Sequence, residues 1–552
     1  MVNPPTCLKL RDWLAAFGLA ALVLLGGAAR IAPRVCGVYH DDAIYVSTAR
    51  ALAEGEGYRL SGVPGAPLQT KYPPLYPAAL AAVYSFWPTF PENLLAMQIV
   101  TLLCGAATVA LSYLYLVRFG YCSRGVAAAG AMMCATASFF LYFCVLAMAE
   151  MPFALLSVIA LWALDTHLEG YGASRRRQFR LGLLLALPFL CRTIGAVFIV
   201  SSVAVLWRAW RPVRACLVGA AIAALPWILW SLVGRGVWDR NPIDGYYTDY
   251  VGCWSSTGFD MLIPVFRANA LWVAIGSSGL VCEGLWAACE PYLASNWCEI
   301  ILAAAGLIPW LMIIRPLSQG RPLPCAMAGY LLLILFWSWP PQRFLVPILP
   351  FLSAYLMAGT SWLLRPIAAA FGRPFAIALT LGALVATNLG LVGHHFQFTR
   401  ETGYPLDRLT HTRVDWSSYE RTLAWLRQNS QPGDVVASGL DSMVSLYAGR
   451  PAFRPFAYNP GRLFYGPDSP RLMSVDELTR ILKRLHPRYL VHTPMPGFAE
   501  EKLFARVLEE LRKRRPDWLQ IVYQDADPRF VVFELNEQYK PSHGLQSVSQ
   551  TD

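Results

Sequence analysis

The sequence predicts an all-α polytopic membrane protein that carries a C-terminal α/β domain outside the bilayer. Of its 552 residues, 56% are hydrophobic and only 15% are charged, whereas about one quarter of the residues in a soluble domain are charged. The hydrophobic residues gather in runs between Trp13 and Val392. A run of about 20 apolar residues is long enough to cross a membrane. The sequence after this region has the composition of an ordinary soluble protein.

The formal net charge of +11 does not indicate a nucleic-acid partner. A nucleic-acid-binding protein concentrates Lys and Arg on one face or in one tail. Here the basic residues occupy short segments between apolar runs. This distribution is instead informative about membrane topology, because basic loops favour the cytoplasmic side.

The hydropathy pattern predicts nine simple membrane helices. The first follows Lys9 and Arg11 and is too long for a signal peptide, with no clean cleavage site after it, so we expect an uncleaved helix. The predicted spans are 13–32, 94–117, 125–147, 152–168, 215–233, 300–314, 325–339, 345–364 and 375–392.

The stretch 181–207 is better explained by a short helical hairpin than by one span. Four arginines precede it, at positions 175, 176, 177 and 180, and three follow it, at 208, 211 and 214. Both ends are therefore predicted to lie in the cytoplasm. The tip of the hairpin carries Arg192 and lies partway across the membrane.

The remaining basic loops give a consistent orientation. The pairs Arg118 and Arg124, Arg315 and Arg321, and Arg365 and Arg373 fall on the side of the N-terminus. The chain then has about eleven membrane helices, a cytoplasmic N-terminus and an extracytoplasmic tail. We expect an integral, multi-pass protein of the inner (plasma) membrane, although one missed span would reverse the side predicted for the tail.

This topology divides the chain into a membrane domain, residues 1–395, and an outer α/β domain, residues 396–540. Residues 541–552 are predicted to be a disordered tail. Two large outer loops, 33–93 and 234–299, interrupt the membrane domain. In the outer domain, short apolar runs at 435–437, 489–491, 521–523 and 530–533 are predicted as strands. They alternate with amphipathic helices that begin near Trp416 and cover 475–485 and 500–514.

The first outer loop holds the residues that best indicate a chemical function. It reads Tyr39-His40-Asp41-Asp42-Ala43-Ile44-Tyr45 and later Lys71-Tyr72-Pro73-Pro74-Leu75. Adjacent carboxylates just past a membrane helix are costly unless they are solvated, paired or functional. The simpler alternative is a solvated loop whose acids have no special role. His40 is expected to be a hydrogen-bonding neighbour and not a ligand.

The order and spacing of these residues resemble the first outer loop of the C-type (GT-C) glycosyltransferases. The likeness is greatest to the protein O-mannosyltransferase, aminoarabinose transferase and RgtA/B/C/D-like branches, and it covers about residues 13–362. In that loop the family typically has Asp-Glu, where this chain has Asp42 in the second place. Tyr72 separates Lys71 from the two prolines, where the aminoarabinose branch has Lys-Pro-Pro. Three later segments also match: Ala149-Glu150-Met151-Pro152-Phe153, Arg192-Thr193, and Gln342-Arg343-Phe344 followed by Pro350.

The resemblance implies transfer of a sugar from a polyprenyl-phosphate donor. Such a reaction needs a base for the acceptor hydroxyl and cations beside the departing phosphate. We expect Asp41 to be the base, Asp42 to be the second choice and Glu150 to be a supporting acid. Lys71 and Arg343 are expected to bind the donor phosphate, with Arg192 as a weaker third.

Each of these assignments has a structural alternative. Arg343 could anchor a helix end at the interface, and Arg192 could only cap or pair inside the hairpin. Glu150 is at a helix N-terminus, where the dipole stabilises a carboxylate in any case. Tyr45 and Tyr72 are the candidate substrate-binding residues, and Tyr45 could equally be a packing residue.

Two other classes of protein compete with a transferase. A transporter or lipid flippase of the cell envelope is expected to show internal repeats with paired broken helices, but the sequence shows one irregular hairpin and no repeat. A structural or assembly protein would leave Asp41, Asp42 and Lys71 unexplained. The acceptor (glycan, lipid, protein or polyol) stays open. Membrane lipids surround the helices. The sequence specifies no cofactor, and two or three of the acids could hold a divalent cation.

Overall fold

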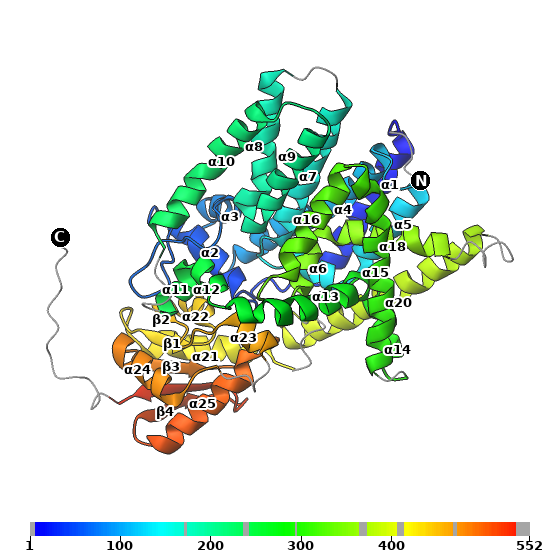
Figure 1. Cartoon of the computed structure of the whole chain (residues 1–552). Helices are drawn as coiled ribbons and strands as arrows, with labels where there is room; N and C mark the ends of the chain where they lie inside the picture. The colour runs from blue at the N-terminus through cyan, green and yellow to red at the C-terminus, as the bar shows by residue number, and fades with distance from the viewer. Residues whose placement is uncertain are drawn as a thin grey trace.

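The computed structural model describes residues 6–170, 174–235, 242–292, 295–363, 373–405, 413–466 and 472–536. It consists of a helical bundle followed by a smaller α/β domain at the far end of the bundle from the N-terminus (Figure 1). The predicted disordered tail, residues 541–552, lies outside the described residues.

The bundle and its loops contain α1 (Leu10–Ala28), α2 (Asp41–Ala53), α3 (Leu75–Phe86), α4 (Leu94–Arg118), α5 (Arg124–Thr136), α6 (Ser138–Cys144), α7 (Glu150–Glu169), α8 (Arg175–Cys191), η1 (Thr193–Gly195), α9 (Ala196–Arg208), α10 (Arg214–Val233), α11 (Pro242–Thr248), α12 (Tyr250–Ser255), η2 (Phe259–Met261), α13 (Leu262–Gly279), α14 (Glu283–Cys289), α15 (Ser295–Ser318), α16 (Pro322–Leu335), α17 (Gln342–Leu345), η3 (Val346–Ile348), α18 (Leu349–Leu363) and α20 (Arg373–Thr402).

The helices of the bundle confirm a multi-pass membrane protein. Within the described residues, seven helices are long and apolar enough to cross a membrane, or eight if α5 and α6, which meet at a bend of 68°, form one span. Three further apolar helices are shorter, namely α3, the segment Thr193–Arg208 and α16. The predicted total of about eleven membrane helices therefore stays unconfirmed.

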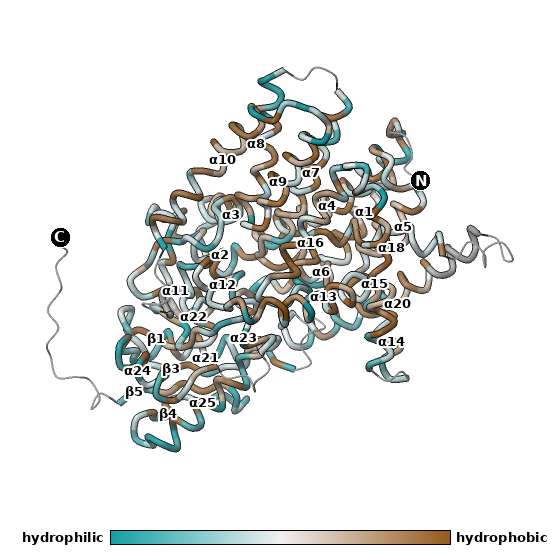
Figure 2. Tube along the Cα trace, in the orientation of Figure 1, coloured by the Kyte–Doolittle hydropathy of each residue, from teal (hydrophilic) through white to brown (hydrophobic). Residues whose placement is uncertain are grey.

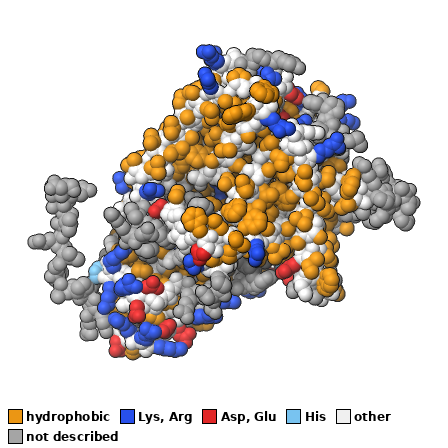
Figure 3. All heavy atoms as spheres, viewed as in Figure 1, with side chains coloured by type: hydrophobic (Ala, Val, Ile, Leu, Met, Phe, Trp, Pro, Cys, Tyr) orange, Lys and Arg blue, Asp and Glu red, His pale blue; other side chains and the backbone are white. Residues whose placement is uncertain are grey.

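The side chains on the outside of the bundle fit a lipid environment. Figures 2 and 3 show hydrophobic residues across the helices of the bundle and charged residues concentrated on the α/β domain and at the loops. Ile222 and Leu229 on α10 and Leu307, Leu311 and Ile314 on α15 are exposed. Exposed apolar surface of this extent is unfavourable in water and favourable in a bilayer.

The predicted hairpin is present. Helix α8 ends at Cys191, Arg192 has extended backbone, and η1 and α9 continue the chain. Leu181 near the start of the hairpin and Leu206 near its end belong to one buried cluster, as expected for two antiparallel arms. The turn at Gly195 is tight, since a Cβ atom there would come within 2.5 Å of the backbone of Pro188 and Phe189.

The segment 234–299, predicted to be an outer loop, contains an additional apolar helix. Phe259–Gly279 is 21 residues long and meets the criteria for a candidate span. It is the least apolar of the seven candidates, because polar residues such as Arg267, Asn269 and Ser277 interrupt it. The buried Asn269 amide compensates for its burial by donating to the carbonyls of Ile334 and Trp337 at the end of α16.

The arginine-rich connections meet at one end of the bundle. Arg118 pairs with Glu169 at 2.7 Å and Arg124 with Asp12 at 2.8 Å, while Arg321 donates to the Phe119 carbonyl. Arg208 bonds the carbonyl of Ser318, and Arg211 bonds that of Leu168. These basic loops therefore lie at one end of the bundle, as predicted, and the α/β domain lies at the opposite end (Figure 1). Of the predicted basic pair Arg365 and Arg373, Arg365 lies outside the described residues.

The C-terminal domain has a five-stranded mixed sheet with the order β2-β1-β3-β5-β4. Strand β1 is parallel to β2 and β3, and β5 is antiparallel to β3 and β4. The four strands and three helices predicted from the sequence are present; α22, β2 and α23 were not predicted. The elements are α21 (Trp416–Asn429), β1 (Val436–Ser438), α22 (Asp441–Ala448), β2 (Ala452–Phe453), α23 (Pro460–Tyr465), α24 (Val475–Leu485), β3 (Tyr489–His492), α25 (Glu500–Arg514), β4 (Leu519–Gln524) and β5 (Val531–Leu535).

The C-terminal domain docks directly on the first outer loop. The Ala452 amide donates to the Gly62 carbonyl at 2.8 Å, extending the edge of β2 towards this loop. Gly37 leaves no space for a side chain, since a Cβ atom would lie 2.6 Å from Met443 Cβ. His40 Nε2 lies 2.7 Å from Asp441 Oδ1 at the start of α22. These contacts fix the loop against a domain that is about 400 residues away in sequence.

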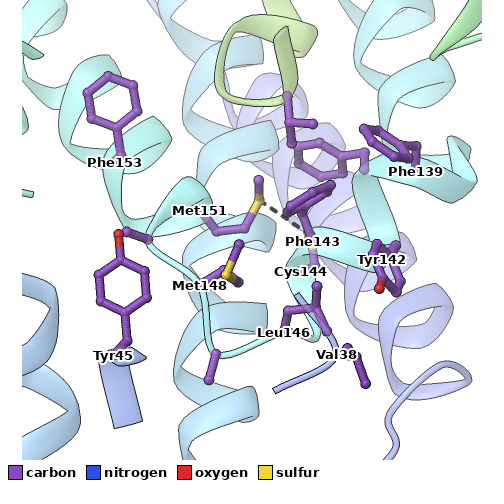
Figure 4. Packing of buried hydrophobic residues seen from close by; sticks show 14 of the residues in the cluster. Val38, Tyr45, Phe139, Tyr142, Phe143, Cys144, Leu146, Met148, Met151 and Phe153 are labelled. Carbon is purple, nitrogen blue, oxygen red and sulfur yellow. Dashed lines mark hydrogen bonds between the residues drawn. The ribbon is translucent and has the colours of Figure 1, made fainter. Parts of the chain in front are cut away.

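A dense core packs against the first outer loop. The segment from Cys144 to Met151, which joins α6 to α7, packs beside Val38 and Tyr45 of the first outer loop (Figure 4). The Cys144 thiol lies 3.5 Å from Met151 Sδ. Because this segment is buried almost without exposure, it holds the start of α7 in a fixed position relative to α2.

Candidate functional site

A cavity of about 570 Å³ lies where the first outer loop, the hairpin tip, α17 and the C-terminal domain meet. Six of the eight residues predicted for the site line it, and the other two lie behind its wall. The lining residues are Asp41, Tyr45, Lys71, Tyr72, Arg192 and Arg343. The segments that carry them are up to 302 residues apart in the chain, so the predicted convergence of the motifs is observed.

Asp41 is the first residue of α2 and points its carboxylate at two donors. Arg343 Nη1 lies 2.6 Å from Asp41 Oδ2, and the Tyr72 hydroxyl donates to Oδ1. Burial alone would raise the pKa of Asp41, but the charges of Arg343, Lys71 and His40 lower it well below the usual range. Asp41 is therefore an ionised carboxylate held in one orientation, which is the form that can accept a proton.

Glu150, the first residue of α7, links two arginines behind the cavity wall. Its side chain is fully buried, and Oε1 accepts hydrogen bonds from both Arg192 Nη1 and Arg343 Nε. Arg343 thus bridges Glu150 and Asp41. Because a buried carboxylate is stable only when it is paired and hydrogen-bonded, Glu150 fixes the positions of both guanidinium groups.

Lys71 lies on the side of the cavity that faces the segment 242–255. Its Nζ is 4.6 Å from the centre of the Tyr246 ring and 5.5 Å from that of Tyr72. These distances permit cation–π attraction. Lys71 also contributes to the low pKa of Asp41, so its ammonium group adds to the positive field of Arg343 and Arg192 at the same cavity.

The two candidate tyrosines have different roles. Tyr72 both lines the cavity and donates to Asp41. Tyr45 is buried, with its ring between those of Tyr72 and Tyr76 at centroid distances of 4.8 and 5.2 Å. It reaches the cavity but is mainly part of this aromatic stack, so packing accounts for most of its contacts.

Asp42 does not line the cavity. Its carboxylate accepts hydrogen bonds from the backbone amides of Gly37 at 2.7 Å and Tyr39 at 3.2 Å, and its exposed fraction is 1%. Burial raises the pKa of Asp42 to about 6, although these amides favour the ionised form. This geometry gives Asp42 the role of a residue that closes the turn before α2, where the left-handed His40 (φ 62°) redirects the chain.

Several residues of the cavity could not be identified from the sequence. His40 is a hydrogen-bonding neighbour, as expected, but its partner Asp441 belongs to the C-terminal domain. Tyr247 also donates to Asp441. Arg454 and Glu500 line the cavity from the same domain. No local pattern marks these positions, because their proximity depends entirely on the docking of that domain.

The charged groups do not form a recognisable cation site. Among the described residues, no group of three or more His, Cys, Asp or Glu side chains is placed to hold a metal ion. Asp41 and Glu150 already share Arg343. A divalent cation at this point would have to compete with a guanidinium group for both carboxylates, so these residues do not fit a metal.

Comparison with known proteins identifies the fold. No protein-family model and no curated protein matches the chain by sequence. Among solved structures, ArnT from Cupriavidus metallidurans bound to undecaprenyl phosphate aligns with a TM-score of 0.53 and 14% identity, over 97% of this chain and 100% of that one. AglB, an oligosaccharyltransferase from Archaeoglobus fulgidus in complex with an inhibitory peptide and a dolichol-phosphate, aligns with a TM-score of 0.51 and 12% identity, over 96% and 75%.

A further structure of the Archaeoglobus fulgidus oligosaccharyltransferase, in complex with Zn and sulfate, aligns with a TM-score of 0.54 and 13% identity, over 95% of this chain and 74% of that one. The resemblance to the GT-C glycosyltransferases is therefore confirmed at the level of the fold. Identities this low do not transfer residue roles, which rest on the geometry of this chain alone.

Proposed function

We propose that the protein is a membrane glycosyltransferase that moves a sugar from a polyprenyl-phosphate donor to an acceptor hydroxyl at the outer face of the inner membrane. The observation that carries this proposal is the cavity in which Arg343 contacts Asp41 while Lys71 and Arg192 lie on the same walls. The site combines a fixed carboxylate base with three cations for a phosphate. The shared fold with proteins whose structures contain undecaprenyl phosphate or dolichol-phosphate supports it.

The cavity suits an amphiphilic donor. Its polar groups face apolar residues such as Ile194, Leu333, Trp337 and Phe344, and Leu333 is partly exposed on the membrane helix α16. A polyprenyl chain can follow this apolar side while its phosphate reaches the cations. Arg343 and Arg192 supply planar, multidentate donors, and Lys71 supplies a compact charge.

In the proposed reaction, the acceptor oxygen attacks the anomeric carbon of the donor sugar. The bond between that carbon and the phosphate oxygen breaks, and polyprenyl phosphate leaves with the electron pair. Asp41 takes the proton of the acceptor hydroxyl. Negative charge grows on the phosphate during the step, and Lys71, Arg343 and Arg192 stabilise it.

Donor binding also prepares the base. The donor phosphate competes with Asp41 for Arg343, and each contact that moves from the carboxylate to the phosphate raises the pKa of Asp41 from its very low value. A carboxylate with a higher pKa is a stronger base. Glu150 continues to hold Arg343 through Nε, so the guanidinium stays in place while its Nη1 changes partner.

The direct test is product formation in membranes that contain the protein. Labelled polyprenyl-phosphate hexoses and pentoses are added with an envelope extract as the acceptor source, and released polyprenyl phosphate and labelled product are measured. We expect both products from wild type and formation slower by about 10²–10⁴-fold from Asp41→Asn, while Asp260→Asn, which alters an exposed pair with Arg462, behaves as wild type. Movement of intact labelled lipid across the membrane without any product would instead indicate a flippase and overturn the proposal.

The outer location of the site is tested separately by cysteine labelling. Gln431 follows α21 and Ser174 precedes α8, and both residues are exposed. Figure 1 shows α21 in the C-terminal domain and α8 in the helical bundle. In a Cys7→Ser background, which removes an exposed native thiol, a membrane-impermeant reagent should label Gln431→Cys in intact cells. It should label Ser174→Cys only after the cells are opened. The reverse pattern would place the cavity on the cytoplasmic side.

A further inference from the structure

The wall of the cavity formed by the C-terminal domain contains a buried arginine with one unused group. Arg454 follows β2 and is 2% exposed. Its Nε donates to the Gly439 carbonyl at 3.0 Å and its Nη1 to the Tyr246 hydroxyl at 2.9 Å. Nη2 has no hydrogen-bond partner in the part of the chain that the structure describes. The guanidinium is thus held rigidly by two bonds and keeps one donor group for something else.

The same wall holds a buried carboxylate in a comparable state. Glu500 is the first residue of α25 and is 2% exposed. By hydrogen-bond geometry, neither of its carboxylate oxygens has a partner among the described residues, although the Tyr458 hydroxyl lies close enough to interact with the carboxylate. The helix N-terminus compensates for part of the charge, but buried polar atoms without partners are rare and destabilising in folded proteins. Both Glu500 and Arg454 line the cavity.

Aromatic rings lie beside these two groups. Tyr246, Tyr458 and Phe498 line the same part of the cavity, and the Arg454 guanidinium carbon lies 5.3 Å from the Tyr246 ring centre and 5.8 Å from that of Phe498. The subsite therefore offers a charged donor, two charged acceptors and apolar ring faces. This combination discriminates between ligand classes.

A phosphate would be attracted by Arg454 but repelled by Glu500, and an ammonium group would experience the opposite pair of forces. A neutral polyhydroxylated ring satisfies both groups, because each hydroxyl can donate to the carboxylate and accept from the guanidinium. Its C–H faces can pack on aromatic side chains, as in other small-molecule sites. We infer that Arg454 and Glu500 form a subsite for a sugar ring that presents neighbouring hydroxyl groups, an inference that rests on the proposed transferase function.

The sugar could belong to the donor or to a glycan acceptor, and binding measurements on the purified full-length chain separate the two. The probes are polyprenyl phosphate without a sugar, the polyprenyl-phosphate hexoses and pentoses named above, and methyl glycosides of the same sugars as acceptor analogues. The primary variant is Glu500→Gln, since Arg454→Met also removes two structural hydrogen bonds. Glu501→Gln is the matched control, because Glu501 is adjacent but bonds the Met495 amide.

We expect Glu500→Gln to lower affinity for one sugar-bearing probe by at least tenfold and to leave affinity for sugar-free polyprenyl phosphate within twofold of wild type. A loss confined to the lipid-linked sugar places the donor sugar in the subsite, and a loss confined to the glycoside places the acceptor there. The melting temperature of Glu500→Gln should equal or exceed that of wild type, because a buried unpaired charge has been removed. Glu501→Gln should change neither affinity.

Unchanged affinity of Glu500→Gln for every sugar-bearing probe overturns the subsite and leaves the proposed function intact. A lower melting temperature with unchanged binding would assign Glu500 a purely structural role and overturn the subsite as well. A wild-type chain that binds no polyprenyl phosphate at all overturns the proposed function itself, and the subsite with it.

Discussion

The two walls of the cavity hold their charged groups in different ways. On the membrane side, Asp41 and Glu150 share Arg343, and Glu150 also holds Arg192. On the side of the C-terminal domain, Arg454 and Glu500 retain polar atoms without partners among the described residues. Both acids of the first wall are therefore ion-paired before any substrate arrives, although Glu150 Oε2 has no hydrogen-bond partner, whereas Glu500 makes no ion pair among the described residues.

This difference suggests that the two walls have different functions. Paired charges need little rearrangement during a reaction, which suits groups that stabilise a charged transition state. Unpaired buried groups cost stability, and a protein retains them where a ligand completes their hydrogen bonds. The membrane wall would then perform the chemistry and the C-terminal wall would recognise a neutral part of a substrate.

The largest effect should follow from removing the proposed base, Asp41, on the membrane wall. Asp41→Asn keeps the shape of the side chain but cannot accept a proton near pH 7. General-base catalysis contributes about 10²–10⁴-fold, so the rate of transfer should fall by that factor while binding of the lipid phosphate remains. Single-turnover assays with saturating donor measure the rate. A loss below tenfold would move the base elsewhere, and Asp42→Asn is the variant to examine next.

A smaller effect is expected where Lys71 joins the two walls. Its ammonium group lies over Tyr246, which in turn accepts a hydrogen bond from Arg454. Lys71→Met keeps the length of the chain and removes the charge. A charged hydrogen bond contributes about 1.5–3 kcal/mol, so donor affinity should fall by about 10- to 150-fold. Arg59→Met, at an exposed position of the same loop, is the control, and equal donor affinity for the two variants would argue against a phosphate contact.

A still smaller effect is expected from weakening the hydrogen bonds of Asp441, which connect the C-terminal domain to the first outer loop. Asp441 accepts hydrogen bonds from His40 and Tyr247, and burial together with the charge of Arg454 lowers the pKa of His40, so the imidazole is neutral near pH 7. Asp441→Asn keeps one acceptor oxygen and should destabilise the protein by about 1–3 kcal/mol. The free energy of unfolding in denaturant measures this loss. Asp434→Asn, at a more exposed pair with Arg488, should cost no more than about 1 kcal/mol.

Most of the membrane wall was predictable from the sequence, and most of the other wall was not. Asp41, Lys71, Glu150 and Arg343 lie in short motifs whose order resembles a known family, and the positive-inside pattern placed them at one end of the bundle. Arg454 and Glu500 reach the cavity only because α22 and β2 dock on the first outer loop. That docking depends on contacts about 400 residues apart in sequence, which leave no periodicity or spacing to detect.

Two other differences have local physical causes. Helix α13 was taken for a loop because buried polar residues such as Asn269 reduce its hydropathy, and their partners on α16 are not visible in the sequence. Asp42 was the second choice for the base because it is adjacent to Asp41. After the left-handed turn at His40, the two carboxylates have different environments. Asp41 faces the cavity, whereas Asp42 accepts hydrogen bonds from backbone amides of its own loop.

The last prediction distinguishes Asp41 from Asp42 by the pH dependence of the reaction. The expected result is that the rate does not change with pH. Arg343, Lys71 and His40 outweigh burial and hold the pKa of Asp41 far below its usual range, whereas burial raises that of Asp42 to about 6. A base works only when ionised. If Asp41 is the base, kcat/KM, which reports the free enzyme, should stay level from pH 8 to about pH 5.

If Asp42 were the base, protonation would reduce kcat/KM by about tenfold at pH 5, one pH unit below its pKa of about 6. The donor, a phosphodiester, keeps its charge throughout this range, so its titration does not contribute. The control is the profile of Asp42→Asn. An acid limb near pH 6 in wild type that disappears in this variant would transfer the catalytic role to Asp42. If kcat/KM is independent of pH in both wild type and Asp42→Asn, the result supports Asp41 as the base.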